Sequence, residues 1–233
     1  MKNTSLAYHI ISIAALLSFF LPFVLVFIKK LFKPRAILWF AAYWLLQGII
    51  NLMFMSGSLV DSRFLTTFQR IFNLADAPFM LFIFYKTIPV KTIKVSVGKM
   101  LPAFLSSSLF VTVFTRLDEF MESLIVGAGL LIILAYLIWI ILHNIKRIKP
   151  DPSTYTLQFV CYGLLFEYGI SVITFVFSYL IKDPQNLPDS LLIYHLSIII
   201  SIGLVSYGLI IYQPVKKPGP IMKKEWESEI RYL

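Results

Sequence analysis

The stretch that decides the fold is residues 66–85, TTFQRIFNLADAPFMLFIFY, an apolar run with polar side chains in its first half. At about 1.5 Å per residue, a helix of this length crosses a bilayer, and Asp76 then lies near the midplane. Gln69, Asn73 and Asp76 fall on one helical face, because successive residues turn by about 100°. Ionisable groups inside a membrane usually face a bundle interior or a wet cavity, so this stripe is the first candidate for a functional site.

The rest of the chain shares this apolar character. Of the 233 residues, 58% are hydrophobic and only 14% are charged, and the apolar residues come in long runs rather than at amphipathic spacing. This composition is typical of polytopic membrane proteins. We therefore expect an all-α fold, a seven-helix transmembrane bundle, with no separate soluble domain.

Seven apolar spans account for most of the length. We expect them at about 6–28, 36–56, 66–85, 100–115, 120–142, 155–181 and 191–212, followed by a tail at 213–233. The span at 100–115 is the shortest, and in a six-span alternative it would be re-entrant. The first span is not expected to be a cleavable signal, because its apolar run is too long and it lacks a basic n-region and a small-residue cleavage site.

The basic residues indicate the orientation of the bundle. Most of the 21 lysines and arginines lie after the first, third and fifth spans and in the tail. By the positive-inside rule, the N-terminus is outside and the C-terminus is cytoplasmic. This alternation favours seven spans over six. It also accounts for the net charge of +9 without a nucleic-acid partner, and we expect a multi-pass protein of the plasma (inner) membrane.

Other spans carry polar residues at the level of Asp76. Glu167 lies near the middle of its span, Gln47 and Asn51 are an i, i+4 pair, and two more polar residues begin the last span. We interpret the set as an outward-facing cavity floored by the two carboxylates. The predicted ligand-binding residues are Asp76, Glu167, Asn73, Asn51, Gln47, Arg70, His195 and Tyr194.

Most of these residues also have a purely structural interpretation. Polar contacts between membrane helices contribute about 0.6 kcal/mol each, which is enough to explain Gln47, Asn51 and the helical face that holds Glu167, Ser171, Thr174 and Ser178. A carboxylate costs about 2.5 to 3.5 kcal/mol at the membrane centre, so Asp76 and Glu167 favour function. Arg70 either pairs with a carboxylate or extends to the surface. Lipid contact and interfacial belts explain most of the aromatic residues.

We predict no metal and no cofactor. Cys161 is the only cysteine, which excludes an internal disulfide and a cysteine-based metal cluster. His9, His195, Asp76 and Glu167 could supply metal ligands, but no local spacing such as HxxxH supports this. The sequence also lacks the patterns of catalytic triads, phosphate loops and zinc fingers, so whether the chain is an enzyme stays open.

One resemblance concerns the microbial rhodopsins, which also have seven spans and an outside N-terminus. The segment from Arg70 to Leu81, with Asp76 and Pro78, is similar to their third helix, and residues 207–210, YGLI, are similar to the end of their seventh. That family needs a lysine in the seventh helix to bind retinal, and the span at 191–212 has none. Covalently bound retinal is therefore excluded, and we do not assign the chain to this family.

Three classes of function fit these observations. The first is a membrane sensor or receptor-like protein, with a small-molecule or lipid ligand in the cavity and a cytoplasmic partner at the tail. The second is a membrane-embedded enzyme acting on a lipid or isoprenoid, with Asp76 and Glu167 as acid and base or as metal ligands. The third is a small transporter or proton carrier that uses the same carboxylates, although the chain lacks the repeated halves of many transporters.

Overall fold

A computed structural model describes residues 6–33, 35–55, 62–115, 117–145, 152–177 and 187–212. These residues are mostly helical, with no strand among them, so the predicted all-α fold is confirmed for the described part of the chain. In chain order the helices are α1 (Leu6–Ser18), α2 (Leu21–Ile28), α3 (Arg35–Met55), α4 (Ser62–Thr87), α5 (Lys91–Val113), α6 (Glu119–Ile145), α7 (Pro152–Phe175) and α8 (Leu187–Ile211).

Six segments are long and apolar enough to cross a membrane, and they indicate a multi-pass membrane protein. They are Tyr8–Ile28, which contains α1 and α2, and Arg35–Met55, Lys91–Val113, Glu119–Ile145, Tyr155–Phe175 and Leu192–Ile211. Helix α4 has 26 residues but is not in this set, because polar and charged residues interrupt its apolar run. It still packs within the bundle, against α3, α5 and α6.

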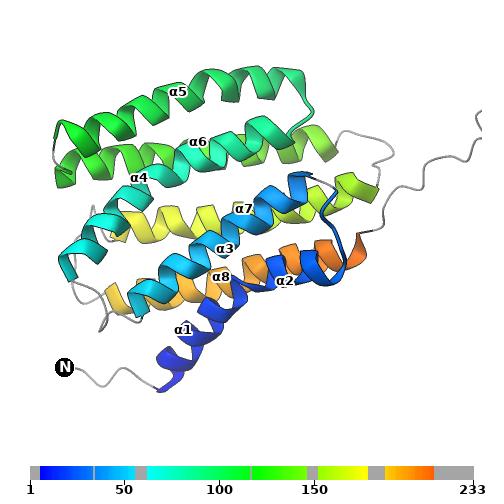
Figure 1. The fold of residues 1–233 in the computed structure, drawn as a ribbon, viewed down its shortest axis with the longest axis horizontal. Coiled ribbons are helices and arrows are strands. Elements are labelled where there is room, and N and C mark those ends of the chain that lie inside the picture. Colours follow the sequence, from blue (N-terminus) through cyan, green and yellow to red (C-terminus); the bar gives the residue numbers. More distant parts are fainter. Residues whose placement is uncertain are drawn as a thin grey trace, which may run out of the picture.

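The long helices lie side by side and successive ones run in opposite directions (Figure 1). The contact between α7 and α8 is the most extensive, α6 packs on α7, α4 and α5, and α1 and α2 pack on α8 and α3. The ammonium of Lys29 donates to the carbonyl oxygen of Leu209 at 3.2 Å, which joins the C-terminal ends of α2 and α8. At each end of the bundle, the C-terminal ends of one set of helices therefore lie beside the N-terminal ends of the helices that alternate with them.

The first span is broken, where we predicted one helix over 6–28. Helix α1 ends at Ser18 and α2 begins at Leu21, with Pro22 in its first turn. Proline has no N–H to donate to the carbonyl four residues earlier, so it is tolerated at a helix start and interrupts a continuous helix. Gly48 of α3 faces this break, since a Cβ atom there would lie 2.9 Å from Cβ of Phe19.

Helix α5 begins at Lys91, earlier than the predicted start near residue 100. Ile93 and Val97, one turn apart, are fully buried against the rest of the bundle, and Lys94 lies over the ring of Tyr85 at 5.2 Å. Lys91 and Lys94, which lie between the spans that we predicted, are therefore on the amphipathic first turn of α5. Helix α5 is continuous through Pro102, which gives no support to a re-entrant segment.

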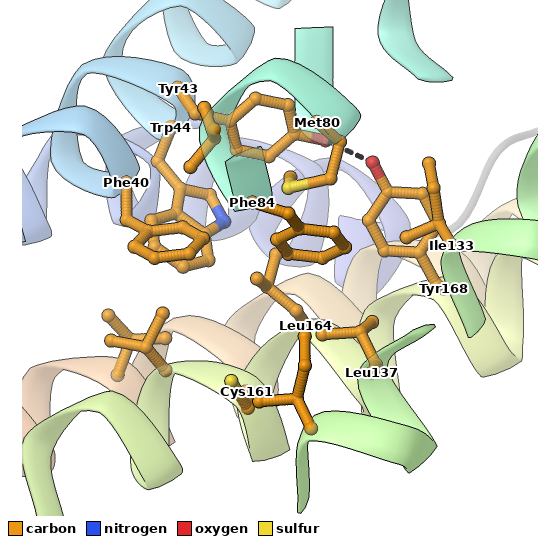
Figure 2. Packing of buried hydrophobic residues seen from close by; sticks show 14 of the residues in the cluster. Phe40, Tyr43, Trp44, Met80, Phe84, Ile133, Leu137, Cys161, Leu164 and Tyr168 are labelled. Carbon is orange, nitrogen blue, oxygen red and sulfur yellow. Dashed lines mark hydrogen bonds between the residues drawn. The ribbon is translucent and has the colours of Figure 1, made fainter. Parts of the chain in front are cut away.

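The hydrophobic core fills one half of the bundle, where α3, α4, α6 and α7 meet residues of α1, α2, α5 and α8. Figure 2 shows its packing around fully buried side chains that include Phe40, Trp44, Met80, Leu137 and Leu164. This half lies toward the end of the bundle that carries Lys29, Lys30, Lys86, Lys91 and Lys94. The opposite half has a different, more polar interior.

Candidate ligand-binding cavity

A cavity of about 360 Å³ lies in the half of the bundle opposite the core. It is partly open and is formed where α3 and α7 end and where α4, α6 and α8 begin. Polar, aromatic and aliphatic side chains line it: Tyr43, Gln47, Ile50, Asn51, Phe54, Gln69, Phe72, Asn73, Asp76, Val126, Leu130, Glu167, Tyr168, Ser171, Thr174, Phe175, Tyr194 and His195. Five helices thus contribute to one site.

All the residues that we predicted as ligand-binding, except Arg70, line this single cavity. They come from α3, α4, α7 and α8, which are far apart in the sequence. Asp76 and Glu167, the two carboxylates expected at one depth, belong to the same lining. The structure therefore brings the set together, and its role in binding a ligand stays a prediction.

Asp76 is held by three neutral donors. Its Oδ1 accepts from the hydroxyl of Tyr43 at 3.0 Å and from Nε2 of Gln47 at 3.3 Å, and its Oδ2 accepts from the hydroxyl of Tyr168 at 2.9 Å. Nε2 of Gln47 also donates to the oxygen of Tyr43 at 3.1 Å. Hydrogen bonds from several donors stabilise a carboxylate in a partly dry site. Asp76 of α4 is thereby tied to α3 and α7.

Glu167 of α7 is more deeply buried, with 5% of its surface exposed. Its Oε2 accepts from the indole Nε1 of Trp44 at 3.1 Å and from the hydroxyl of Ser201 at 3.2 Å. Its Oε1 accepts no hydrogen bond from the residues that the structure describes. Glu167 therefore binds to α3 and α8 through one oxygen and keeps the other oxygen free of these donors.

Arg70 turns away from the cavity. Its Nε donates to Oε2 of Glu122 on α6 at 2.5 Å, and its guanidinium also donates to the carbonyl oxygen of Leu117. The side chain of Glu122 is 4% exposed and that of Arg70 is 27% exposed, so the pair is mostly removed from water. Arg70 thus fastens α4 to the start of α6, and it does not neutralise Asp76 or Glu167.

Other polar residues of the lining bond within their own helices. The amide of Asn51 donates to the carbonyl oxygen of Gln47, the hydroxyl of Ser171 to that of Glu167, and the hydroxyl of Thr174 to that of Ile170. These bonds lie within one helix, whereas the structural interpretation expected bonds between helices, and the side chains face the cavity. Ser178, predicted on the same face, lies outside the described residues.

The entrance to the cavity is bordered by aromatic groups of α1 and α8. The ring of His195 lies 5.9 Å from those of Tyr8 and Tyr194. His9 is exposed and its ring lies 6.1 Å from that of Tyr8. Among the described residues, no group of three or more His, Cys, Asp or Glu side chains could hold a metal ion. The metal alternative that joined His9 and His195 to the carboxylates thus finds no support.

The floor of the cavity rests directly on the hydrophobic core. One helical turn closer to the lysine-bearing end, Phe40 lies below Tyr43 and Trp44, Met80 lies below Asp76, and Leu164 lies below Glu167. All three are almost completely buried. The dashed line in Figure 2 marks the contact of Tyr43 with Tyr168 just above them. A packed apolar layer therefore separates the cavity from the lysine-bearing end of the bundle.

Four residues that support the site were missed in the sequence analysis: Tyr43, Trp44, Tyr168 and Ser201. We assigned the aromatic residues to lipid contact, yet Trp44 is fully buried and bonds Glu167. One signal was available, because Tyr43, Gln47 and Asn51 are spaced by four and share one helical face. Ser201 had no such signal, since its partners come from a different helix.

Comparisons with protein families, with curated proteins and with solved structures found no match to this chain.

Proposed function

We propose that this chain is an integral membrane sensor, receptor-like, that binds a small molecule in the cavity from the outer side and transmits binding to the inner side. The observation that carries the proposal is that the cavity is closed at its inner end. Five helices meet around one open polar cavity, and its floor is bonded to the packed core beneath it. Such a cavity suits ligand binding with a conformational response better than passage through the membrane.

The charge distribution supports an outward-facing cavity. Lys29, Lys30, Lys86, Lys91 and Lys94 gather at the end of the bundle opposite the cavity. Since basic residues mark the cytoplasmic side of a membrane protein, the cavity end would face outward, with the N-terminus outside and the tail at 213–233 inside. In a bacterial cell, this membrane would be the plasma (inner) membrane.

Seven crossings follow if α4 also spans the membrane. Its polar residues lower its apolar content, but Gln69, Asn73 and Asp76 line the cavity and Arg70 is paired with Glu122. None of these four side chains then needs to contact lipid, which removes the main cost of placing them in a membrane. Helix α4 would serve as the third span, with its polar face toward the site.

The bonds of Asp76 suggest how binding would reach the inner side. Tyr43 of α3 and Tyr168 of α7 both hold this carboxylate, and both belong to the core. A ligand that shifts either tyrosine would change the bonds that hold three helices together at Asp76. If the bundle has two packings, a ligand that binds one better shifts the population toward it.

Cysteine accessibility tests the direction of the cavity. Cys161 is the only native cysteine and is buried, so Cys161→Ala gives a clean background. We would add Ser171→Cys in the cavity, with exposed controls Glu119→Cys at the cavity end and Lys91→Cys at the lysine-bearing end. Trimethylammonioethyl methanethiosulfonate, which does not cross membranes, should modify Ser171→Cys and Glu119→Cys only from outside. Modification of Ser171→Cys from both sides would favour a transporter and overturn the proposal.

Filling the cavity covalently tests the sensor mechanism without a known ligand. Neutral benzyl methanethiosulfonate would attach to Ser171→Cys, and hydrogen exchange would be followed at the lysine-bearing ends of α4 and α6. A sensor should change protection there, whereas the same reagent on Glu119→Cys should have no effect. Unchanged protection after complete modification would contradict transmission through the bundle.

A further inference from the structure

The charges that line the cavity are unbalanced. Asp76 and Glu167 are acidic, whereas neither lysine nor arginine is among the lining residues. Arg70, the cation nearest to Asp76 in the sequence of α4, is engaged by Glu122 and by the carbonyl oxygen of Leu117. His195 is the only imidazole of the lining. The described residues therefore give the cavity two carboxylates and no permanent positive charge.

The two carboxylates differ in how many further hydrogen bonds their oxygens can accept. Asp76 receives hydrogen bonds at both oxygens, from Tyr43, Gln47 and Tyr168. Glu167 receives both of its bonds at Oε2, and Oε1 has no donor among the described residues. Glu167 as a whole is largely buried, and a charge there that the protein bonds incompletely is costly unless water or a ligand supplies a partner. The free acceptor on Glu167 is thus the position where a ligand with a charged N–H donor gains most.

Much of the remaining wall is aromatic. Phe54, Phe72 and Phe175 line the cavity together with the rings of Tyr43, Tyr168 and Tyr194. The face of an aromatic ring attracts an organic cation, and its apolar surface binds hydrocarbon. No group of three metal-ligating side chains occurs among the described residues, so these walls suit an organic cation better than a metal ion. A volume of about 360 Å³ matches a small organic molecule.

From this arrangement we infer that the ligand is a small organic ammonium compound, with its nitrogen at Oε1 of Glu167 and its hydrocarbon part against the aromatic wall. This inference rests on the proposed function, because it names the ligand class of the same cavity. Asp76, which already accepts hydrogen bonds from neutral donors at both oxygens, adds negative potential to the site rather than a direct bond.

Pairs of probes that differ in charge but not in shape test the inference. Binding to purified wild-type protein in lipid nanodiscs would be measured for 2-phenylethylammonium against 2-phenylethanol and for butylammonium against 1-butanol. Phenylacetate serves as the anion. At least one cation should bind about tenfold more tightly than its neutral partner, since a charge-assisted hydrogen bond is roughly twice as strong as a neutral one. Phenylacetate should bind most weakly.

Substitution at Glu167 then locates the nitrogen. Glu167→Gln should remove the preference for the cation and leave the affinity of the neutral partner unchanged, whereas Glu119→Gln, at an exposed position outside the cavity, should change neither. The inference fails if no cation binds, if neutral or anionic partners bind as tightly, or if the preference survives Glu167→Gln.

A second measurement needs neither a ligand nor a change at Glu167. The thiol of Ser171→Cys should react faster with the cationic trimethylammonioethyl reagent than with the anionic sulfonatoethyl reagent. Relative to the ratio for a free thiol in solution, we expect the preference to rise at least about tenfold, because negative potential concentrates cations in a cleft. An unchanged ratio would overturn the inference.

The two proposals can fail separately. Covalent filling with a neutral group reports on transmission whatever the natural ligand is. A response at the inner ends without any preference for cations would refute only the ligand class. A preference for cations without such a response would refute only the sensor.

Discussion

The phenol oxygens of Tyr43 and Tyr168 lie 3.0 Å apart, and each is also within hydrogen-bonding distance of Asp76. These three contacts join α3, α4 and α7 at the cavity floor. When Asp76 is ionised, only two hydroxyl protons are available for the three contacts, so they cannot all be hydrogen bonds at once. The tyrosines therefore form a partly redundant cradle, in which one hydroxyl can replace the other.

Removing the hydroxyls of both Tyr43 and Tyr168 should lower the free energy of unfolding by more than the sum of the two single changes. Tyr43→Phe and Tyr168→Phe should each lower the free energy of unfolding by about 1 kcal/mol, because the other tyrosine still serves Asp76. The double variant leaves only Gln47 as a described donor, and we expect a further loss of about 1 kcal/mol or more. Unfolding in mixed micelles measures this cycle, with exposed Tyr155→Phe as control. Strict additivity would contradict the shared role.

The pair of Arg70 with Glu122 should matter for stability and not for binding. Arg70→Ala leaves Glu122 buried without its counter-charge, and we expect a loss of about 1–3 kcal/mol, less than for a fully buried pair because Arg70 is partly exposed. The double variant Arg70→Met with Glu122→Gln should recover part of this loss. Ligand affinity should be unchanged in correctly folded protein, since neither residue lines the cavity. A selective loss of binding would show that Arg70 acts at the site after all.

Close packing of α7 on α8 depends on Gly163. A Cβ atom there would lie 2.7 Å from the carbonyl oxygen of Ser201 and 2.7 Å from Cγ2 of Val205. Gly163→Ala should push the helices apart, break the bonds of Ser201 to Gly163 and Glu167, and cost about 1–3 kcal/mol. Gly169→Ala on the same helix is the matched control, because its Cβ would meet nothing within 4 Å. Thermal unfolding of the two variants side by side checks the difference; equal melting temperatures would refute the packing argument.

Local periodicity made much of the helical fold predictable. Apolar runs indicated the spans, and the spacing of Gln69, Asn73 and Asp76 indicated one polar face on α4. The first turns of α5 were not predicted, because Lys91 and Lys94 made this segment resemble a loop. In the structure, Ile93 and Val97 of the same segment are buried in the bundle. The break after Ser18 could have been inferred from Pro22, which the long apolar run obscured.

The partners of the polar residues were much harder to predict. Depth in the membrane follows from position along a span, so Asp76 and Glu167 could be assigned to one level. Which donor meets which oxygen depends on how helices rotate and pack, and one sequence does not encode this in any local pattern. Arg70 illustrates the limit: its partner Glu122 lies near the start of the span predicted at 120–142, and no local pattern indicated that this carboxylate lies beside α4.

The tail provides the test that separates the three classes of function. It lies outside the described residues, and its sequence fits two alternatives: a short amphipathic helix around Trp226 and Ile230, on the inner membrane surface or against a partner, or a disordered end with a basic anchor. Deleting residues 223–233 should leave the bundle intact, because the described end of α8 is fixed through Lys29.

If the chain is a sensor, the truncated protein should bind the cationic probe with unchanged affinity in nanodiscs, while the transcriptional response of the source cells to that probe disappears. An enzyme or transporter should keep most of its turnover or flux, since the carboxylates and the cavity are untouched. Full-length protein with Glu119→Gln controls for the handling of a variant, and a truncated chain that still signals would remove the tail from the mechanism.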